Sequence, residues 1–205
     1  MKMRNYHSHI LKIHEKEQGW RKLKTPNMPL DIEIGCGVGM HPLLYSSTHP
    51  ERFLIAIEKT REKFGKFAKK NNTIGPYQNL LPIHGNSTYW LPQHIGSQEV
   101  DQYFILYPCP YPRAAQANKR WFNMPFMAYL IDTLKPRGTI TLATNEQFYF
   151  NEACQQAQDI WGLTIQESRL LPQNFPARTH FEKKYLERQE HCYQLVVQKQ
   201  SQHLN

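Results

Sequence analysis

Three alternating glycines at the end of an apolar run constrain this chain more than any other feature of its sequence. Residues 31–40 read Asp-Ile-Glu-Ile-Gly-Cys-Gly-Val-Gly-Met, which places Gly35, Gly37 and Gly39 directly after the apolar residues. Such a run suits a buried strand, and the glycines let the backbone turn tightly and approach a ligand that a Cβ atom would exclude. With Pro42 early in the following segment, the pattern predicts a strand, a ligand-binding turn and a helix.

A second apolar run, residues 53–58, ends in the carboxylate of Glu58. At the tip of the next parallel strand, that carboxylate is placed to accept hydrogen bonds from the two hydroxyls of a ribose. The two runs together predict an adenosine-containing cofactor at the carboxyl edge of a parallel sheet. A glycine-rich turn without a ligand is the alternative, and the agreement of strand, glycines and distal acid argues against it.

The strict dinucleotide fingerprint fails, because Met40 occupies the position of its third glycine. Glu33, inside the first strand, would oppose a pyrophosphate but suits the ammonium group of S-adenosylmethionine, which carries no phosphate. The pattern Glu-x-Gly-x-Gly-x-Gly resembles the first motif of the class I S-adenosylmethionine-dependent methyltransferases. We therefore expect the methionine end of this cofactor to be held by Glu33, Gly35, Gly37 and Gly39, and its ribose by Glu58.

Strands and helices alternate along the rest of the chain, which indicates an α/β fold with a Rossmann-like, doubly wound, mostly parallel sheet. The class I methyltransferase resemblance implies seven strands. We expect strands near residues 30–35, 53–58, 80–84, 101–107, 139–144, 163–170 and 191–198. Helices are expected near residues 40–48, 60–71, 122–134 and 146–160. The segment 135–138, Lys-Pro-Arg-Gly, is expected to turn the chain into the fifth strand.

A chain of 205 residues suits one domain with short extensions. We expect residues 1–28 to form a basic N-terminal arm with a helix near residues 9–18, and residues 29–205 to form the methyltransferase domain. No apolar segment approaches the length of a membrane span, and the N-terminus lacks a signal-peptide apolar region, so a cytoplasmic protein is expected.

The formal net charge of +8 favours a polyanionic partner or an anionic surface. Basic residues crowd residues 2–24 and recur in residues 59–70, although a solvated helix face would show the same run. The four cysteines form no C-x-x-C pair and the ten histidines lack metal-ligand spacing, so we expect no metal and no disulfide framework. The expected oligomeric state is a monomer or a homodimer.

Motifs in the second half resemble a narrower family, the tRNA 7-methylguanosine methyltransferases. These motifs are Tyr107-Pro-Cys-Pro-Tyr-Pro-Arg113, residues 135–145 and Ala177-Arg-Thr-His-Phe-Glu182. The family has a Pro-Asp-Pro-Trp loop, a Lys-Pro-x-Gly turn, an Ala-Thr-Asp strand end and a late Thr-x-x-Glu. The resemblance runs from about residue 30 to residue 197. It implies methyl transfer to guanine in tRNA.

Three family carboxylates are replaced by neutral side chains: Cys109 stands at the loop aspartate, Asn86 follows the third strand, and Asn145 ends the fifth. An amide still offers a donor and an acceptor, so Asn86 is expected to contact the adenine. A thiol accepts hydrogen bonds weakly, so the loss at Cys109 weakens guanine recognition unless another acceptor compensates.

The resemblance implies a set of residues that face the substrate. The expected catalytic residues are Cys109 and Arg113, and the expected substrate-binding residues are Tyr111, Arg113, Asn145, Thr179 and Glu182. Lys119 and Arg120 are further candidates for contacts to tRNA phosphates.

Several alternatives stay open for these residues. Thr-x-x-Glu is also a helix capping box, Tyr111 packs the loop or stacks on an unpaired base, and Lys119 and Arg120 suit an exposed polar loop. Cys109 as a nucleophile on a pyrimidine ring lacks an activating base in the sequence. The loop also resembles faintly the Asn-Pro-Pro-Tyr loop of exocyclic-amine methyltransferases, without the amide.

The function expected from the sequence is S-adenosylmethionine-dependent formation of 7-methylguanosine in tRNA. One rival is a methyltransferase with another substrate in the same cofactor cleft. The other is a binding module that keeps the fold and tRNA affinity without turnover.

Overall fold

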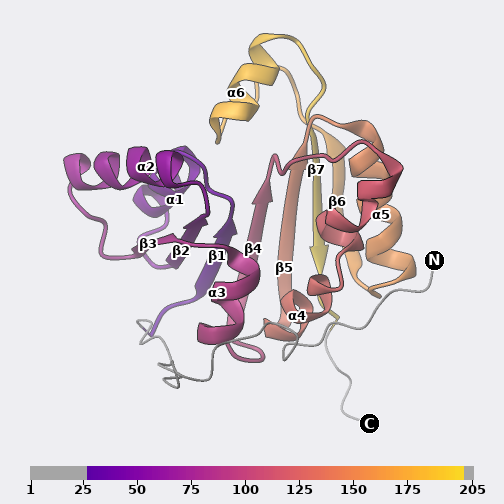
Figure 1. Ribbon diagram of the computed structural model, residues 1–205, viewed down its shortest axis with the longest axis horizontal. Coiled ribbons are helices and arrows are strands. Elements are labelled where there is room, and N and C mark those ends of the chain that lie inside the picture. The colour runs from indigo at the N-terminus through magenta and orange to yellow at the C-terminus, as the bar shows by residue number, and fades with distance from the viewer. Residues whose placement is uncertain (1–26, 201–205) are drawn as a thin grey trace.

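The computed structural model describes residues 27–200, which contain one seven-stranded sheet with the strand order β3-β2-β1-β4-β5-β7-β6 (Figure 1). The strands are β1 (Leu30–Ile34), β2 (Phe53–Glu58), β3 (Leu80–His84), β4 (Val100–Leu106), β5 (Leu134–Thr144), β6 (Thr164–Leu170) and β7 (Tyr193–Gln198). The first five strands pair in parallel, and β7 lies antiparallel to both β5 and β6. This arrangement confirms the predicted Rossmann-like, mostly parallel sheet.

Helices cover both faces of the sheet (Figure 1). They are α1 (Met40–Thr48), α2 (Arg61–Ile74), α3 (Ser87–His94), α4 (Phe126–Thr133), α5 (Gln147–Asp159) and α6 (His180–Glu187), with short 3₁₀ helices at Ala114–Lys119 and Trp121–Asn123. On one face, Leu43 of α1 and Phe67 of α2 pack on Leu54 and Phe104. On the other, α3, α4 and α5 contribute Leu91, Leu130, Tyr149 and Ala153 to a larger apolar cluster. The sheet is therefore doubly wound, as the alternation of elements predicts.

Two helices and one turn differ from the sequence expectation. No helix was expected at α3, which is short and contains Pro92, and α6 was expected only through the alternative interpretation of Thr-x-x-Glu as a helix capping box. The expected turn at residues 135–138 is included in β5, but the segment forms an irregularity there: the register with β4 passes from Val100 opposite Leu134 to Gln102 opposite Thr139, and Arg137 has a left-handed φ of 66°. Gly138 permits this path, since a Cβ atom there would lie 2.9 Å from the carbonyl oxygen of Lys135 and 3.1 Å from that of Asp101.

The predicted helix over residues 9–18 and nearly all of the predicted basic arm lie outside the described residues. The division into an arm and a domain therefore stays a prediction. Within residues 27–200, no helix combines the length and the apolar character needed to cross a membrane.

The glycine turn between β1 and α1 adopts a left-handed backbone at all three predicted positions. Gly35, Gly37 and Gly39 have φ angles of 80°, 59° and 80°, a region that residues with a Cβ atom rarely adopt. Gly39 has a second reason to be glycine, because a Cβ atom there would lie 2.0 Å from the Phe67 ring of α2. The third glycine thus allows α2 to pack closely on the start of α1.

Replacing Gly39 by alanine should destabilise the protein. The left-handed backbone costs about 1–2 kcal/mol for alanine, and overpacking against Phe67 adds about 1–3 kcal/mol. Gly65→Ala is the matched control, because Gly65 lies inside α2 with open space around its Cβ position; it should stabilise by about 0.5–1 kcal/mol. Urea unfolding of both variants measures the difference, and equal midpoints would contradict the packing role of Gly39.

Candidate functional site

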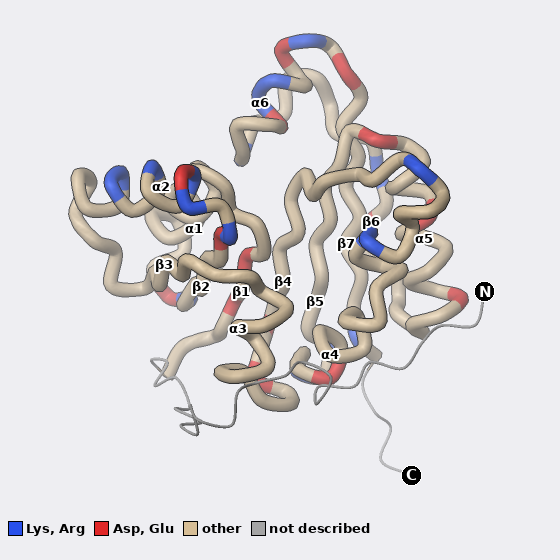
Figure 2. The backbone as a smooth tube through the Cα atoms, in the orientation of Figure 1, with Lys and Arg blue, Asp and Glu red and all other residues tan. Residues whose placement is uncertain are grey.

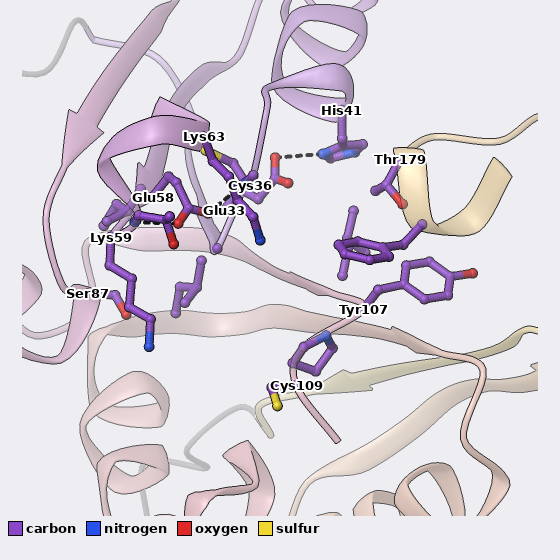
Figure 3. A pocket seen from close by; sticks show the side chains of 18 of the residues that line it. Glu33, Cys36, His41, Glu58, Lys59, Lys63, Ser87, Tyr107, Cys109 and Thr179 are labelled. Atoms are coloured by element: carbon purple, nitrogen blue, oxygen red, sulfur yellow. Dashed lines mark hydrogen bonds and ion pairs between the residues drawn. The ribbon is translucent and has the colours of Figure 1, made fainter. Parts of the chain in front are cut away.

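A cavity of about 850 Å³ lies at the carboxyl ends of β1, β2 and β4 (Figure 3). Its walls come from the turn after β1, the end of β2, the side of α2, the start of α3, the loop after β4 and the start of α6. Figure 3 shows Glu58, Lys59 and Ser87 at one end of this cavity, and Thr179 and Tyr107 at the other. This edge of a doubly wound sheet is where ligands of such folds bind.

Two buried carboxylates define one end of the cavity. Glu33 is 2% exposed and Glu58 is 5% exposed, and both border the cavity. Glu58 accepts hydrogen bonds from the backbone N–H of Gly37 (2.9 Å) and of Thr60 (2.6 Å). A carboxylate oxygen has two acceptor sites, so these bonds leave Glu58 able to accept from a ligand as well.

Glu33 has a partner that the sequence analysis missed. The Nδ1 atom of His41 lies 2.8 Å from an Oε atom of Glu33 (Figure 3). The imidazole ring packs edge-on against Phe104. His41 borders the cavity and is itself buried. Its only signal in the sequence is its place at the start of the helix after the glycines, which does not by itself distinguish it from a core histidine.

The glycines divide between two roles. Gly35 and Gly37 border the cavity, and a Cβ atom built on either would meet nothing within 4 Å. Open space therefore lies beside the backbone of these two glycines, and a ligand can approach that backbone closely. Gly39, predicted as a third cofactor-binding residue, does not border the cavity and instead accommodates Phe67.

Asn86 caps α3 at the edge of the cavity. Its side-chain oxygen accepts a hydrogen bond from the backbone N–H of Thr88 (3.2 Å), which satisfies one of the first N–H groups of that helix. Asn86 and the neighbouring Ser87 both border the cavity near the end of β3. The amide predicted to contact the cofactor is thus at the cavity, and it also serves the fold.

The loop after β4 has an unusual backbone. Tyr107 and Tyr111 have φ angles of 51° and 45°, in a region that bulky residues rarely adopt. Both border the cavity, as does Cys109, an exposed free thiol. Strained backbone of this kind persists where the surroundings hold it, and it is common at functional sites.

The remaining predicted residues differ in their position relative to the cavity. Arg113 is exposed and Asn145 donates to Glu190 (3.3 Å), and neither borders the cavity. Lys119 does border it, with its ammonium 5.6 Å from the centre of the Tyr111 ring. The phosphate-contact role considered for Arg120 is contradicted, because its guanidinium is buried beside Glu152 at 3.0 Å.

Thr179 and Glu182 separate in the structure. Thr179 borders the cavity and caps α6, with its hydroxyl accepting from the backbone N–H of Glu182 (3.0 Å). Glu182 does not border the cavity: it is 0% exposed and binds the guanidinium and backbone N–H of Arg178 and the hydroxyl of Tyr107. The capping interpretation of Thr-x-x-Glu is therefore realised at Thr179.

The buried network around Glu182 shifts the pKa values of two acids, Glu182 and Tyr107, in opposite directions. Burial raises the pKa of Glu182, but the hydrogen bonds and charge of Arg178 outweigh it, so that pKa lies below its ordinary value of 4.5. Burial and the adjacent Glu182 charge raise the pKa of Tyr107 far above its ordinary value. Tyr107 therefore stays a neutral hydrogen-bond donor at physiological pH.

Four lysines that the sequence analysis did not assign to the site also border the cavity: Lys59, Lys63, Lys66 and Lys70. Within residues 27–200, no group of three or more histidine, cysteine, aspartate or glutamate side chains is arranged to hold a metal ion. The chemistry that these described residues offer is acidic at the ends of β1 and β2 and basic along α2.

A family model described as "Putative methyltransferase" matches residues 27–195. Curated proteins with the name tRNA (guanine-N(7)-)-methyltransferase are similar as well. The Chlorobium phaeobacteroides protein is 23% identical, with 90% of this chain and 89% of the relative covered. The Mycolicibacterium gilvum protein is 28% identical over 59% of this chain and 48% of the relative. The Thermotoga maritima protein is 22% identical over 88% of this chain and 57% of the relative. The chain thus spans about half the length of the latter two relatives.

Solved structures show the same fold at low sequence identity. An antibiotic-related methyltransferase superposes with a TM-score of 0.63 at 14% identity, covering 83% of this chain and 87% of the other. A methyltransferase from Pyrococcus furiosus gives a TM-score of 0.62 at 14% identity, with 84% and 76% covered. These matches agree with the α/β architecture described above.

Replacing Arg178 by methionine should destabilise the protein in a pH-dependent way. At pH 7 it leaves the buried Glu182 charge without its main partner, at a cost of about 3–5 kcal/mol. Because the folded pKa of Glu182 is depressed, its contribution is present above the unfolded pKa and is lost as pH falls through the folded pKa. Without Arg178, burial raises that pKa, so the variant gains relative stability as pH falls.

Urea unfolding at pH 7 and pH 4 measures this difference. The difference in free energy of unfolding between wild type and Arg178→Met should be large at pH 7 and smaller at pH 4. Lys183→Met is the control, because Lys183 lies on the same helix in an exposed pair with Glu187 (3.8 Å) and should change stability by less than about 0.5 kcal/mol. A gap of equal size at both pH values would contradict the assignment of an ionised Glu182.

Proposed function

The chain belongs to the methyltransferase family whose model matches residues 27–195, and we propose that it transfers a methyl group from S-adenosylmethionine to guanine in tRNA, forming 7-methylguanosine. The observation that carries this proposal is the cavity itself, in which two buried carboxylates and a bare glycine backbone lie beside the strained loop after β4. The curated relatives named for tRNA guanine-N7 methylation support the substrate. We propose a cytoplasmic location on the same ground.

The residues at one end of the cavity fit the proposed cofactor. Glu33 supplies a negative charge for the ammonium group, Gly35 and Gly37 supply open backbone, and Glu58 supplies acceptors for the ribose hydroxyls. Asn86 borders the same end and offers an amide to the adenine. When bound, S-adenosylmethionine supplies an activated methyl group on a sulfonium. Gly39 supports this site through packing on Phe67.

The proposed reaction requires little acid–base catalysis by the protein. The N7 atom of guanine carries a free lone pair at neutral pH, so no general base has to act before methyl transfer. The residues around the cavity have to align the base with the methyl donor and exclude water. The Tyr107–Arg113 loop, whose strained backbone is tied to α6 through Tyr107 and Glu182, suits that positioning role.

We assign the predicted substrate residues to different distances from the base. Cys109, Tyr111 and Thr179 border the cavity and are proposed to contact the target nucleotide. Arg113 and Asn145 lie outside it and are proposed to contact RNA at the periphery. Glu182 is proposed to act through Tyr107 and Arg178, as a positioning residue.

One observation favours a second candidate, methyl transfer to another nucleobase. Guanine presents donors on its Watson–Crick edge, and an ionised carboxylate is their strongest acceptor. Among the described residues that border the cavity, Glu33 and Glu58 are the carboxylates, and both lie at the proposed cofactor end. Cys109 and the buried Glu182 leave the substrate end without one, which weakens the selection for guanine.

Labelled S-adenosylmethionine and total tRNA that lacks 7-methylguanosine test both candidates. Label should appear in tRNA, and nucleoside analysis should identify 7-methylguanosine. Cys109→Ala should retain transfer, whereas Glu58→Gln should weaken cofactor binding about 10- to 100-fold, because one charged acceptor of the ribose is lost. Label in another nucleoside would favour the second candidate, and tRNA binding without label would favour a module without turnover.

Thiol labelling tests whether Cys109 faces the cofactor. Cys109 is exposed, whereas Cys36 is buried and its pKa is raised by burial and by the charges of Glu33 and Glu58. A maleimide at neutral pH should therefore modify Cys109 fastest, and Cys109→Ala should remove the fast phase. Saturating S-adenosylhomocysteine should slow the reaction; an unchanged rate would place Cys109 away from the bound cofactor.

A further inference from the structure

The side of α2 that faces the cavity is basic along most of its length. Lys63, Lys66 and Lys70 border the cavity and are separated by three and four positions, which places them on one face of the helix. Figure 2 shows Lys and Arg residues along α2. From Lys63 to Lys70 the helix rises by about 10 Å. This face, Lys63–Lys66–Lys70, is called the α2 lysine wall below.

The charge of the α2 lysine wall is weakly compensated within the described residues. Glu62 pairs with Lys66 at 2.6 Å, but both side chains are well exposed, at 76% and 60%, so the pair contributes little. The two carboxylates that border the cavity already have other partners. Glu33 is hydrogen-bonded to His41, and Glu58 accepts from two backbone N–H groups. The wall therefore offers positive charge to a ligand.

The proposed cofactor does not account for this charge. S-adenosylmethionine carries a single carboxylate, an ammonium and a sulfonium, and no phosphate, so it could match at most one of the three ammonium groups along its cleft. Lysine is a point charge that suits phosphate. The anions that match a row of lysines beside a cavity proposed to receive a nucleobase are the phosphates of a nucleic-acid strand.

An exposed aromatic side chain faces the wall from α6. Phe181 is 42% exposed, borders the cavity, and has the Lys63 ammonium 5.8 Å from its ring centre. An exposed phenylalanine in a basic groove is typical of proteins that bind unpaired nucleotides, because bases stack on the ring while cations follow the backbone. The two helices thus flank the cavity with complementary groups.

We propose that the α2 lysine wall binds the phosphates of the RNA strand that flanks the methylated nucleotide, and that Phe181 stacks on an unpaired base of that strand. This inference rests on the proposed function for the class of substrate. It adds a path for the strand: along α2 and into the cavity between α2 and α6.

The salt dependence of tRNA binding tests the wall. Lys66→Gln/Lys70→Gln should lower affinity and reduce the slope of log K against log salt by about 0.7 for each lost phosphate contact. The matched control is Arg61→Gln/Lys69→Gln, which removes the same charge from the same helix at residues that do not border the cavity. That control should leave the slope near the wild-type value. All four side chains are exposed, and thermal unfolding should confirm that both variants fold.

Two outcomes would overturn the proposal that the α2 lysine wall binds RNA phosphates. Equal loss of slope in both double variants would show that only net charge matters. Loss of binding to phosphatidylserine vesicles in Lys66→Gln/Lys70→Gln, with tRNA binding unchanged, would assign the wall to a membrane surface. Neither readout requires turnover. A changed slope without methyl transfer would refute the proposed activity alone, and methyl transfer with an unchanged slope would refute the wall alone.

Phe181 is tested separately. Phe181→Ala should weaken tRNA binding on the order of tenfold without changing the salt slope, because stacking is not an ionic contact. Phe181→Tyr keeps an aromatic ring and should bind as wild type does. Equal affinity of the alanine and tyrosine variants would overturn the stacking role.

Discussion

The hydrogen bonds between the end of β2 and the glycine turn hold the cavity in shape. The backbone N–H groups of Gly35 and Cys36 donate to the carbonyl oxygen of Ile57 (2.8 and 3.1 Å), and Gly37 donates to the Glu58 carboxylate (2.9 Å). Because β1 and β2 are adjacent and parallel, both chain segments leave the sheet at the same edge. The turn is thereby fixed with its bare backbone open to the cavity, and the proposed cofactor end depends on this bracing.

The opposite end of the cavity is held by side chains. There, α6 stands away from the sheet over a small apolar cluster of Leu171, Leu186 and Cys192 (Figure 1). The buried Glu182 joins this helix to the loop after β4 through Tyr107, and Arg178 continues the network to Gln194 on β7 (2.6 Å). A fully bonded buried network of this kind specifies one arrangement, since each unpaired member would be costly.

These two modes of support differ in how much substitution they tolerate. Backbone hydrogen bonds at the glycine turn tolerate few substitutions, because they need left-handed residues and a carboxylate. The proposed substrate end consists of exposed or side-chain-braced groups, among them the exposed Cys109 and the ion pair of Arg178 with Glu182. The α2 lysines border the cavity and Phe181 faces them from the start of α6, and their proposed contacts act through charge and stacking without reading the sequence of the strand.

Local patterns in the sequence determined the strand–turn–helix at residues 31–48, the order of the seven strands along the chain and the placing of Glu33, Gly35, Gly37 and Glu58 at one sheet edge. Each of these features follows from a periodicity, a glycine or a strand end that can be recognised within a few residues of sequence. The short helix α3, the inclusion of residues 135–138 in β5, and the partners His41 and Arg178 emerged only from the tertiary structure. A side chain's partner far along the chain depends on which elements pack together, and no local pattern encodes that packing. For the same reason the sequence placed Glu182 toward the substrate, whereas the folded chain buries it beneath the loop that it supports.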